Sequence, residues 1–347
     1  MSRKEPTRSI RLQRHKRRRK RIFYTLGALG VFIIAAAGAL LFFFISQANN
    51  LVEETQDPLD RGEFSERRDV AVDPSEDNIS VLFLGTDDRE GDLNGLSDAI
   101  LLATFNRQED SVKVVSIPRD SYVQIPGRQS EDKINHAHAI GGADLAVETV
   151  EDFLDIPVDY YVTLNFDAFM EVTDAFGGVD VNSPFAFYEQ DSEGNPDSIF
   201  INEGEQTLNG EEALAYVRMR KQDPMGDLGR GERQQEVFES LIDEATSLSS
   251  ITSYNEVFNR LQENMNMNIS FNEITSLHSY AGSVNDIELY QLEGDSINKN
   301  GIDYFQVTDT SLANTRATLK NHLELDEGAD PEESGETITA GEDTQDE

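Results

Sequence analysis

The chain has no cysteine, and basic residues are scarce beyond its N-terminus. The absence of disulfides fits an exported domain held together by its core. A zinc site is not expected, because His136 and His138 lack further cysteine or histidine partners, and both are predicted to lie in a polar loop.

Residues 1–22 hold 11 of the 29 Lys and Arg, which leaves 18 basic residues against 65 acidic ones in the rest of the chain. So acidic a surface repels nucleic acid, and no nucleic-acid partner is expected.

One long uncharged apolar run lies near the N-terminus, from Phe23 to Ile45. As a helix it would be about 34 Å long, enough to cross a hydrocarbon core of about 30 Å. It is too long for the apolar part of a cleaved signal peptide. The basic cluster Arg14–Arg21 abuts it and is expected to stay cytoplasmic, although such a cluster also occurs in nucleic-acid-binding segments. The sequence therefore predicts a single-pass type II protein of the cell membrane, with its acidic part extracellular.

Composition and patterning divide the chain into six segments. We predict a basic cytoplasmic arm (1–22), a transmembrane signal-anchor helix (23–46) and a polar extracellular linker (47–78). A folded domain (79–250) follows, with a C-terminal part (251–323) that packs on it. The tail (324–347) has eleven acidic residues and no Lys or Arg, and is predicted to be disordered.

Strand and helix patterns alternate through the central segment. Short β-branched runs predict buried strands at 79–85, 99–105 and 112–117, with further strands at 159–166 and after Gly178. Apolar residues at helical spacing predict helices at 142–154, 233–245 and 307–323, and a helix capped by Asn209 with Glu212 three residues later. This order predicts an α/β fold, an α/β/α sandwich around a central mixed β-sheet.

Carboxylates stand at the ends of neighbouring predicted strands. Asp87 and Asp88 follow the first strand and Asp98 precedes the second. Such carboxylates can converge on a hard cation that takes further oxygen ligands from a phosphate. Asp and Gly are also ordinary turn residues, so the pattern alone leaves both interpretations open.

The stretch from Tyr216 to Gln235 gathers Arg218, Arg220, Lys221, Arg230 and Arg233. Arg230, Arg233 and Gln234 lie at the predicted start of a helix, with a spacing that places them on one side. Helix N–H groups and guanidinium groups can grip phosphate oxygens together there. Surface ion pairs with neighbouring acidic residues are the alternative.

Seven segments in order resemble the LytR-CpsA-Psr family of membrane-anchored cell-wall polymer transferases. They are VLFLGTDDR, SDAIL, VVSIPRDSYVQIPG, KINHAHAIGGADLAVETVE, DYYVTLNFDAF, FGGVDV and ALAYVRMRKQDPMGDLGRGERQQ, within Ile79–Ala245. The resemblance implies a domain that binds a polyprenyl-pyrophosphate-linked glycopolymer, with the lipid in an apolar tunnel. It also implies transfer of the polymer, of the wall teichoic acid type, to peptidoglycan as a phosphodiester.

The same resemblance implies roles for single residues. Asp87 and Asp98 match the carboxylates that bind Mg²⁺ or Mn²⁺. Contacts to pyrophosphate are implied for Arg89, Arg119, Arg218, Arg220, Arg230, Arg233 and Gln234, and Asp227 matches an acidic position of the second basic motif. Leu96 stands where the family commonly has Arg, with Arg128 and Lys133 as candidate substitutes.

Phosphoryl transfer depends mainly on positioning and charge neutralisation, so a metal and several guanidinium groups suffice, with Arg119, Asp98 and Asp227 as the candidate catalytic residues. Asp98 or Asp227 could accept the proton of the attacking hydroxyl, but a metal ligand is a poor base, and the base is left unassigned.

Two other functions stay open: a membrane-anchored regulator of LytR type, and a lipid-pyrophosphate phosphatase. About twenty cytoplasmic residues are too few for a folded DNA reader.

Overall fold

The computed structural model describes residues 57–62, 64–86, 93–246, 264–270, 273 and 287–325, without the side chains of 227 and 242–246. The predicted membrane span and cytoplasmic arm lie outside these residues, and so does most of the acidic tail. Within the described residues, no helix is long and apolar enough to cross a membrane.

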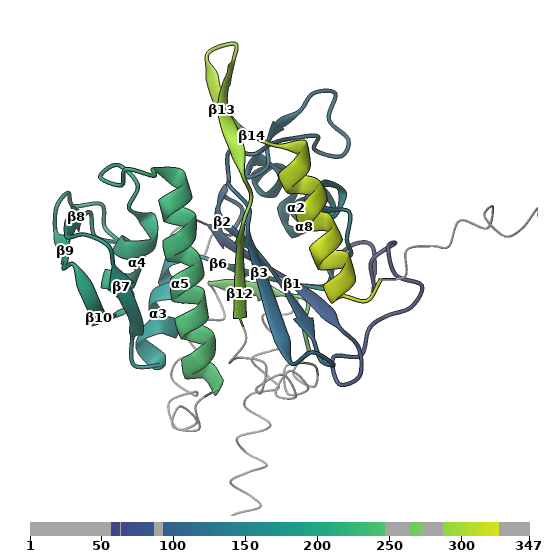
Figure 1. Ribbon diagram of the computed structural model, residues 1–347, viewed down its shortest axis with the longest axis horizontal. Coiled ribbons are helices and arrows are strands. Elements are labelled where there is room, and N and C mark those ends of the chain that lie inside the picture. The colour runs from purple at the N-terminus through teal and green to yellow at the C-terminus, as the bar shows by residue number, and fades with distance from the viewer. Residues whose placement is uncertain are drawn as a thin grey trace, which may run out of the picture.

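A mixed six-stranded sheet forms the centre of the molecule (Figure 1). Its strand order is β11-β6-β1-β2-β3-β12, in which β1 pairs parallel to β6, β3 pairs parallel to β12, and the other pairs are antiparallel. The bounds are β1 Ile79–Thr86, β2 Ser97–Asn106, β3 Ser111–Ser116, β6 Tyr160–Leu164, β11 Met265–Met267 and β12 Ile287–Gln291. The two edge strands, β11 and β12, come from the C-terminal part of the chain.

Helices cover both faces of this sheet, which confirms the predicted α/β/α arrangement. Helices α2 (His136–Leu154) and α8 (Asp309–His322) lie on one face, and α3 (Phe166–Ala175), α4 (Gly210–Arg218) and α5 (Asp227–Thr246) lie on the other (Figure 1). Alternation along β1 supplies both cores: Leu82 and Leu84 pack in the cluster that includes α2 and α8, whereas Val81 packs in the cluster that includes α3. The predicted cap of α4 is confirmed, because Asn209 and Glu212 form a reciprocal capping box.

The start of α2 corrects one prediction. His136 and His138 lie in its first turn and not in a polar loop. Gly141 and Gly142 have non-helical backbone angles and divide the helix. Only the part after this kink shows clear helical spacing in the sequence, which is why the first part was missed. His138 is buried and its Nδ1 lies 2.9 Å from the carbonyl oxygen of Gly95.

Four short strands build a small lobe beside α4 and α5. The strand β7 (Val179–Ser183) pairs with β10 (Gly204–Leu208), and β8 (Phe187–Glu189) pairs with β9 (Ile199–Ile201). Two other pairs, β4 (Tyr122–Val123) with β5 (Asp132–Lys133) and β13 (Gly294–Lys299) with β14 (Ile302–Val307), lie outside this lobe. The β13–β14 hairpin projects from one end of the molecule (Figure 1).

Residues 57–78, within the predicted linker, pack against the domain. Arg61 forms an ion pair with Glu151 at 2.7 Å, and Arg68 binds both carboxylate oxygens of Asp159 at 3.0 and 2.8 Å. Both carboxylates are nearly buried, with 9% and 2% of their side chains exposed. These contacts tie the segment to the end of α2 and the start of β6, so it belongs to the folded body.

Candidate functional site

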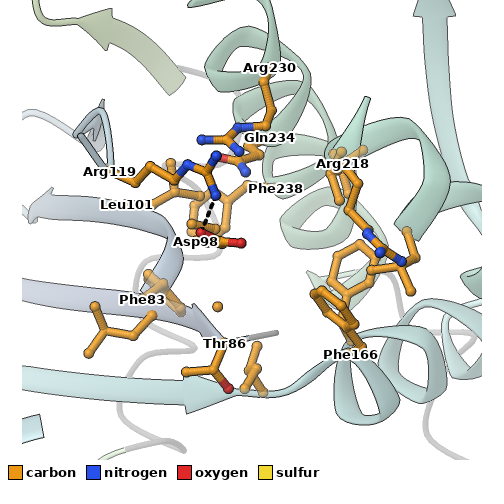
Figure 2. Close-up of a pocket in the computed structure, with 18 of the residues that line it drawn as sticks. Phe83, Thr86, Asp98, Leu101, Arg119, Phe166, Arg218, Arg230, Gln234 and Phe238 are labelled. Atoms are coloured by element: carbon orange, nitrogen blue, oxygen red, sulfur yellow. Dashed lines mark hydrogen bonds and ion pairs between the residues drawn. The ribbon is translucent and has the colours of Figure 1, made fainter. Parts of the chain in front are cut away.

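A cavity of about 390 Å³ lies between the sheet and the helices α3, α4 and α5 (Figure 2). Its walls have two kinds of lining. Apolar side chains come from β1 and β2 (Phe83, Leu84, Ala99, Leu101), from β6 and α3 (Leu164, Phe166, Phe169), and from α4 and α5 (Leu214, Val217, Val237, Phe238, Leu241). The basic side chains are Arg119, Arg218, Arg220, Lys221 and Arg230. An apolar chamber with several cations is suited to an amphiphile with an anionic head group.

Asp98 reaches this cavity because β2 carries an extra residue. Gly85 of β1 pairs with Ala99, but the next residue, Thr86, pairs with Ser97, so Asp98 has no partner opposite it. A β-bulge of this kind turns a side chain out of the normal alternation. Gly85 permits the close strand approach, since a Cβ there would lie 3.0 Å from that of Ala99. In this position Asp98 Oδ1 accepts a hydrogen bond from the Arg119 guanidinium (Figure 2).

The ends of β1 and β2 also hold two hydroxyl groups that suit a cation. Thr86 Oγ1 and Ser97 Oγ are buried and have no hydrogen-bond partner among the described residues. They adjoin Asp87 and Asp98 in sequence, and oxygen atoms are the ligands that Mg²⁺ prefers. Asp87 lies outside the described residues, within which no group of three or more acidic, His or Cys residues could hold a metal. The described oxygen atoms at this end of the sheet, from Thr86, Ser97 and Asp98, are of the kind that Mg²⁺ prefers.

Four of the predicted phosphate contacts converge on the cavity from α4, α5 and the loop between them. Arg230 and Gln234 project toward Arg119, while Arg218 approaches from the other side, its guanidinium 4.6 Å from the ring centre of Phe166 (Figure 2). Arg220 lines the cavity as well and is exposed. Gly231 brings α5 close to the sheet, because a Cβ there would meet Ser116 and Gln291 at 3.0 Å.

Arg233 does not line this cavity, although the sequence groups it with the phosphate contacts. Its side chain is buried, and all three guanidinium nitrogens are bound inside the protein. Nε donates to the Tyr216 carbonyl at 3.0 Å, one Nη donates to Asp223 and the other to the Met219 carbonyl. Arg233 thus holds the loop that follows α4 against α5.

The helical spacing explains this separation. At about 100° per residue, Gln234 lies about 40° from Arg230 in one direction, and Arg233 lies about 60° away in the other. Tyr216 adds a second contact on that side, donating from its hydroxyl to Glu236 Oε2 at 2.6 Å. Burial and the hydrogen bond to Glu236 both raise the pKa of Tyr216, which therefore stays protonated as a donor.

The other predicted residues are placed as follows. Asp87 and Arg89 lie outside the described residues, as does the side chain of Asp227. Leu96 is 40% exposed, close before the bulge. Of its candidate substitutes, Lys133 forms an ion pair with Asp120 at 2.6 Å and Arg128 is exposed, and neither lines the cavity.

Sequence reasoning missed Glu189 and Gln190, which line the cavity from the end of β8. A strand of three residues shows no recognisable period, and an acidic residue in an acidic chain carries no signal of its own. The pairing of Glu189 with Ile199 across the hairpin places it at the cavity.

Comparisons of sequence and of structure relate the chain to known proteins. The LytR_cpsA_psr family model matches residues 42–321. The polyisoprenyl-teichoic acid–peptidoglycan teichoic acid transferase TagU of Bacillus licheniformis is 37% identical over 316 residues, covering 90% of this chain and 99% of TagU. A structure of TagT bound to LIIa-WTA superposes with a TM-score of 0.66 at 40% identity, over 78% of this chain and all of that one. TagT with bound octaprenyl pyrophosphate lipid gives 0.62 at 38% identity, with the same coverage.

Proposed function

The chain belongs to the LytR-CpsA-Psr family, and from that premise we propose how its cavity works. The protein is a transferase that moves an anionic glycopolymer of the teichoic acid type from a polyprenyl-pyrophosphate carrier to peptidoglycan. The polymer becomes attached through a phosphodiester, and polyprenyl phosphate is released. Its partners are accordingly the lipid-linked polymer, the peptidoglycan acceptor and the cell membrane.

The observation that carries this proposal is the joining of two linings in one cavity. Twelve apolar side chains and five basic ones surround the same space. A polyprenyl chain that packs against the apolar side chains leaves water, which contributes about 0.8 kcal/mol of binding free energy for each buried CH₂. The pyrophosphate, with its several anionic oxygens, is neutralised by the basic side chains.

The arginines stabilise the transition state in which charge spreads over the transferred phosphoryl group. Arg119, Arg218, Arg220, Arg230 and Gln234 supply the donors, and Arg89 is proposed to add another from outside the described residues. Arg119 is also held by Asp98, so its guanidinium is fixed before substrate arrives. Arg233 does not contact the substrate, but its buried hydrogen bonds hold the loop that carries Arg220.

Asp87 and Asp98 are proposed to hold Mg²⁺ or Mn²⁺, helped by the hydroxyls of Thr86 and Ser97. The metal would supply positive charge against the pyrophosphate oxygens. Asp98 already accepts a hydrogen bond from Arg119 at Oδ1, and its other oxygen points away from that contact (Figure 2). A single carboxylate can thereby join the cation to the arginine cluster.

The protein acts at the cell envelope, and we propose a single-pass type II topology for it. Phe23–Ile45 would span the membrane, with the basic arm inside and the cavity outside. Since residues 57–78 pack on the domain, only about ten residues, 47–56, separate that span from the folded body. A short connection keeps the cavity near the lipid bilayer that supplies the substrate.

A product assay tests this function. The full-length protein in detergent is mixed with Mg²⁺, a polyprenyl-pyrophosphate-linked sugar and peptidoglycan, and the products are analysed by mass spectrometry. Sugar phosphate bound to glycan, together with polyprenyl phosphate, is the expected result. Free phosphate or sugar phosphate would establish a phosphatase instead, and the absence of both turnover and lipid binding would support a regulator.

A further inference from the structure

The β8–β9 hairpin presents two features at the cavity that the donor lipid does not use: a carboxylate directed inward and an aromatic pair directed outward. On the basis of the proposed transferase function, we propose that this hairpin is the acceptor side of the site. Tyr188 and Phe200 bind a sugar ring of the peptidoglycan glycan strand, and Glu189 accepts the proton of the attacking hydroxyl.

The carboxylate argument starts from the two acidic residues that line the cavity within the described part of the chain. Asp98 forms an ion pair with Arg119, so its carboxylate is already engaged. Glu189 forms no ion pair with a described residue, and its Oε1 accepts only the backbone N–H of Gln190, at 3.0 Å. Glu189 is therefore the better placed general base.

The position of Glu189 also suits the direction of attack. The leaving phosphate carries the polyprenyl chain, whose apolar place is between the sheet and α3, α4 and α5. In phosphoryl transfer the nucleophile and the leaving oxygen lie roughly in line on opposite sides of phosphorus. Glu189 comes from β8, which lies across α4 and α5 from the strand β2 that carries Asp98 (Figure 1).

The aromatic pair lies on the outer side of the same hairpin. Tyr188 and Phe200 are directly opposed across β8 and β9, with ring centres 4.6 Å apart, and remain 51% and 45% exposed. Cross-strand aromatic contact stabilises a hairpin, but it does not require two large rings to face water. Because Tyr188 and Glu189 alternate in direction, the rings are placed to hold a sugar next to the reacting one.

Charge selects the occupant of this surface. Residues 187–205 contain six acidic residues and no Lys or Arg. Such a hairpin repels an anionic lipid surface and an anionic polymer alike. An uncharged pyranose ring has an apolar face that can lie on an aromatic ring, and a glycan strand offers many of them.

The hairpin is held to the phosphate-binding loop. Gln222 Nε2 donates to the Tyr188 carbonyl at 2.6 Å, directly after Arg220 and Lys221 of the cavity wall. On the inner side, the Phe187 ring stacks with that of Tyr216 at 6.2 Å. The proposed acceptor-binding hairpin and the loop that carries Arg220 and Lys221 are therefore held in fixed positions relative to each other.

The proposed step balances as follows. The acceptor hydroxyl oxygen forms a bond to the sugar-linked phosphorus while its proton passes to the Glu189 carboxylate. The bond between that phosphorus and the bridging oxygen breaks, and polyprenyl phosphate leaves with the electron pair. Solvent later takes the proton from Glu189.

The experiment uses full-length protein, polyprenyl-pyrophosphate-linked sugar and soluble peptidoglycan glycan strands. Glu189→Gln should lower kcat about 100-fold or more without changing the donor Kd, and should remove the low-pH decline of kcat/KM. Glu189→Asp should restore part of the rate. Glu203→Gln, which makes the same charge change on an exposed residue after β9, is the control and should behave as wild type.

The double variant Tyr188→Thr, Phe200→Thr replaces both rings with β-branched residues, which suit a strand. It should raise the acceptor KM at least about tenfold, with donor Kd unchanged. Loss of binding to anionic phospholipid vesicles, with an unchanged acceptor KM, would assign the aromatic pair to the membrane and overturn its acceptor role. Wild-type kinetics in Glu189→Gln would overturn the base assignment. If the wild-type protein itself transfers no sugar to glycan, the transferase function fails and not merely this acceptor site.

Discussion

Arg233 and Asp223 form an ion pair whose side chains are only 4% and 5% exposed. The pair joins the loop after α4 to α5. Gly229 makes room for it, because a Cβ at that position would lie 2.0 Å from an oxygen of Asp223. Gly229 and Arg233, both in the basic motif, therefore hold in place the loop that carries Arg220 and Lys221.

Arg233→Gln should therefore act first on stability. Removing one partner of a buried ion pair leaves the other charge uncompensated and costs about 3–5 kcal/mol. Thermal unfolding of the variant should show a markedly lower Tm, with Arg220→Gln, an exposed residue of the same motif, as the matched control. A normal Tm together with lost lipid binding would instead place Arg233 at the phosphate.

Arg218→Gln should have the opposite signature. Its guanidinium lines the cavity against the Phe166 ring, so its loss removes a charge-assisted phosphate contact while the core stays intact. The Kd for polyprenyl pyrophosphate should rise about 10- to 100-fold, with Tm nearly unchanged. Charge reversal, Arg218→Glu, should weaken binding further, and binding at wild-type strength would remove Arg218 from the pyrophosphate site.

Asp98→Asn should change the metal requirement. Asparagine keeps the shape but loses the negative charge that attracts the cation, so half-maximal activity should need at least about tenfold more Mg²⁺. Asp295→Asn, an exposed carboxylate of β13 far from the cavity lining, is the control. Identical magnesium titrations for the two variants would exclude Asp98 as a ligand.

His322 should make the fold sensitive to acid. Its ring is buried between Thr104 Oγ1, 2.7 Å from Nδ1, and Ser111 Oγ, 2.9 Å from Nε2. Burial, with a smaller effect from Lys113, lowers its pKa from 6.5 to about 4. The unfolded chain therefore binds this proton more readily, and the His322 contribution to stability is complete above about pH 7 and declines from 6.5 toward 4.

The expected size of that decline is about 1.4 kcal/mol per pH unit within the window. Urea unfolding of wild type and His322→Gln at pH 7, 6 and 5 measures it as a difference between the two proteins. The stability gap between them should narrow as the pH falls. A gap that stays constant would show that His322 does not titrate with folding.

The central strands, the α4 cap and most of the cavity arginines could be predicted from sequence, because each depends on local pattern or on a long motif. Arg233 could not be separated from Arg230, since spacings of three and four residues look alike until a partner such as Asp223 takes one side of the helix. The bulge at Asp98 was hidden for a similar reason: it depends on which residue of β1 pairs with Ser97. Glu189 depends on a tertiary contact of a three-residue strand, which leaves no periodic trace.

Photo-crosslinking tests the central claim most directly, namely that one cavity holds the lipid chain and the pyrophosphate together. A polyprenyl pyrophosphate with a diazirine in its chain is bound to the full-length protein, irradiated, and the labelled peptides are sequenced by mass spectrometry. We predict labelling of the apolar wall at Phe83, Leu101 and Phe238, competed away by unlabelled polyprenyl pyrophosphate. Labelling confined to the α2 and α8 face of the sheet, or unaffected by the competitor, would contradict the account.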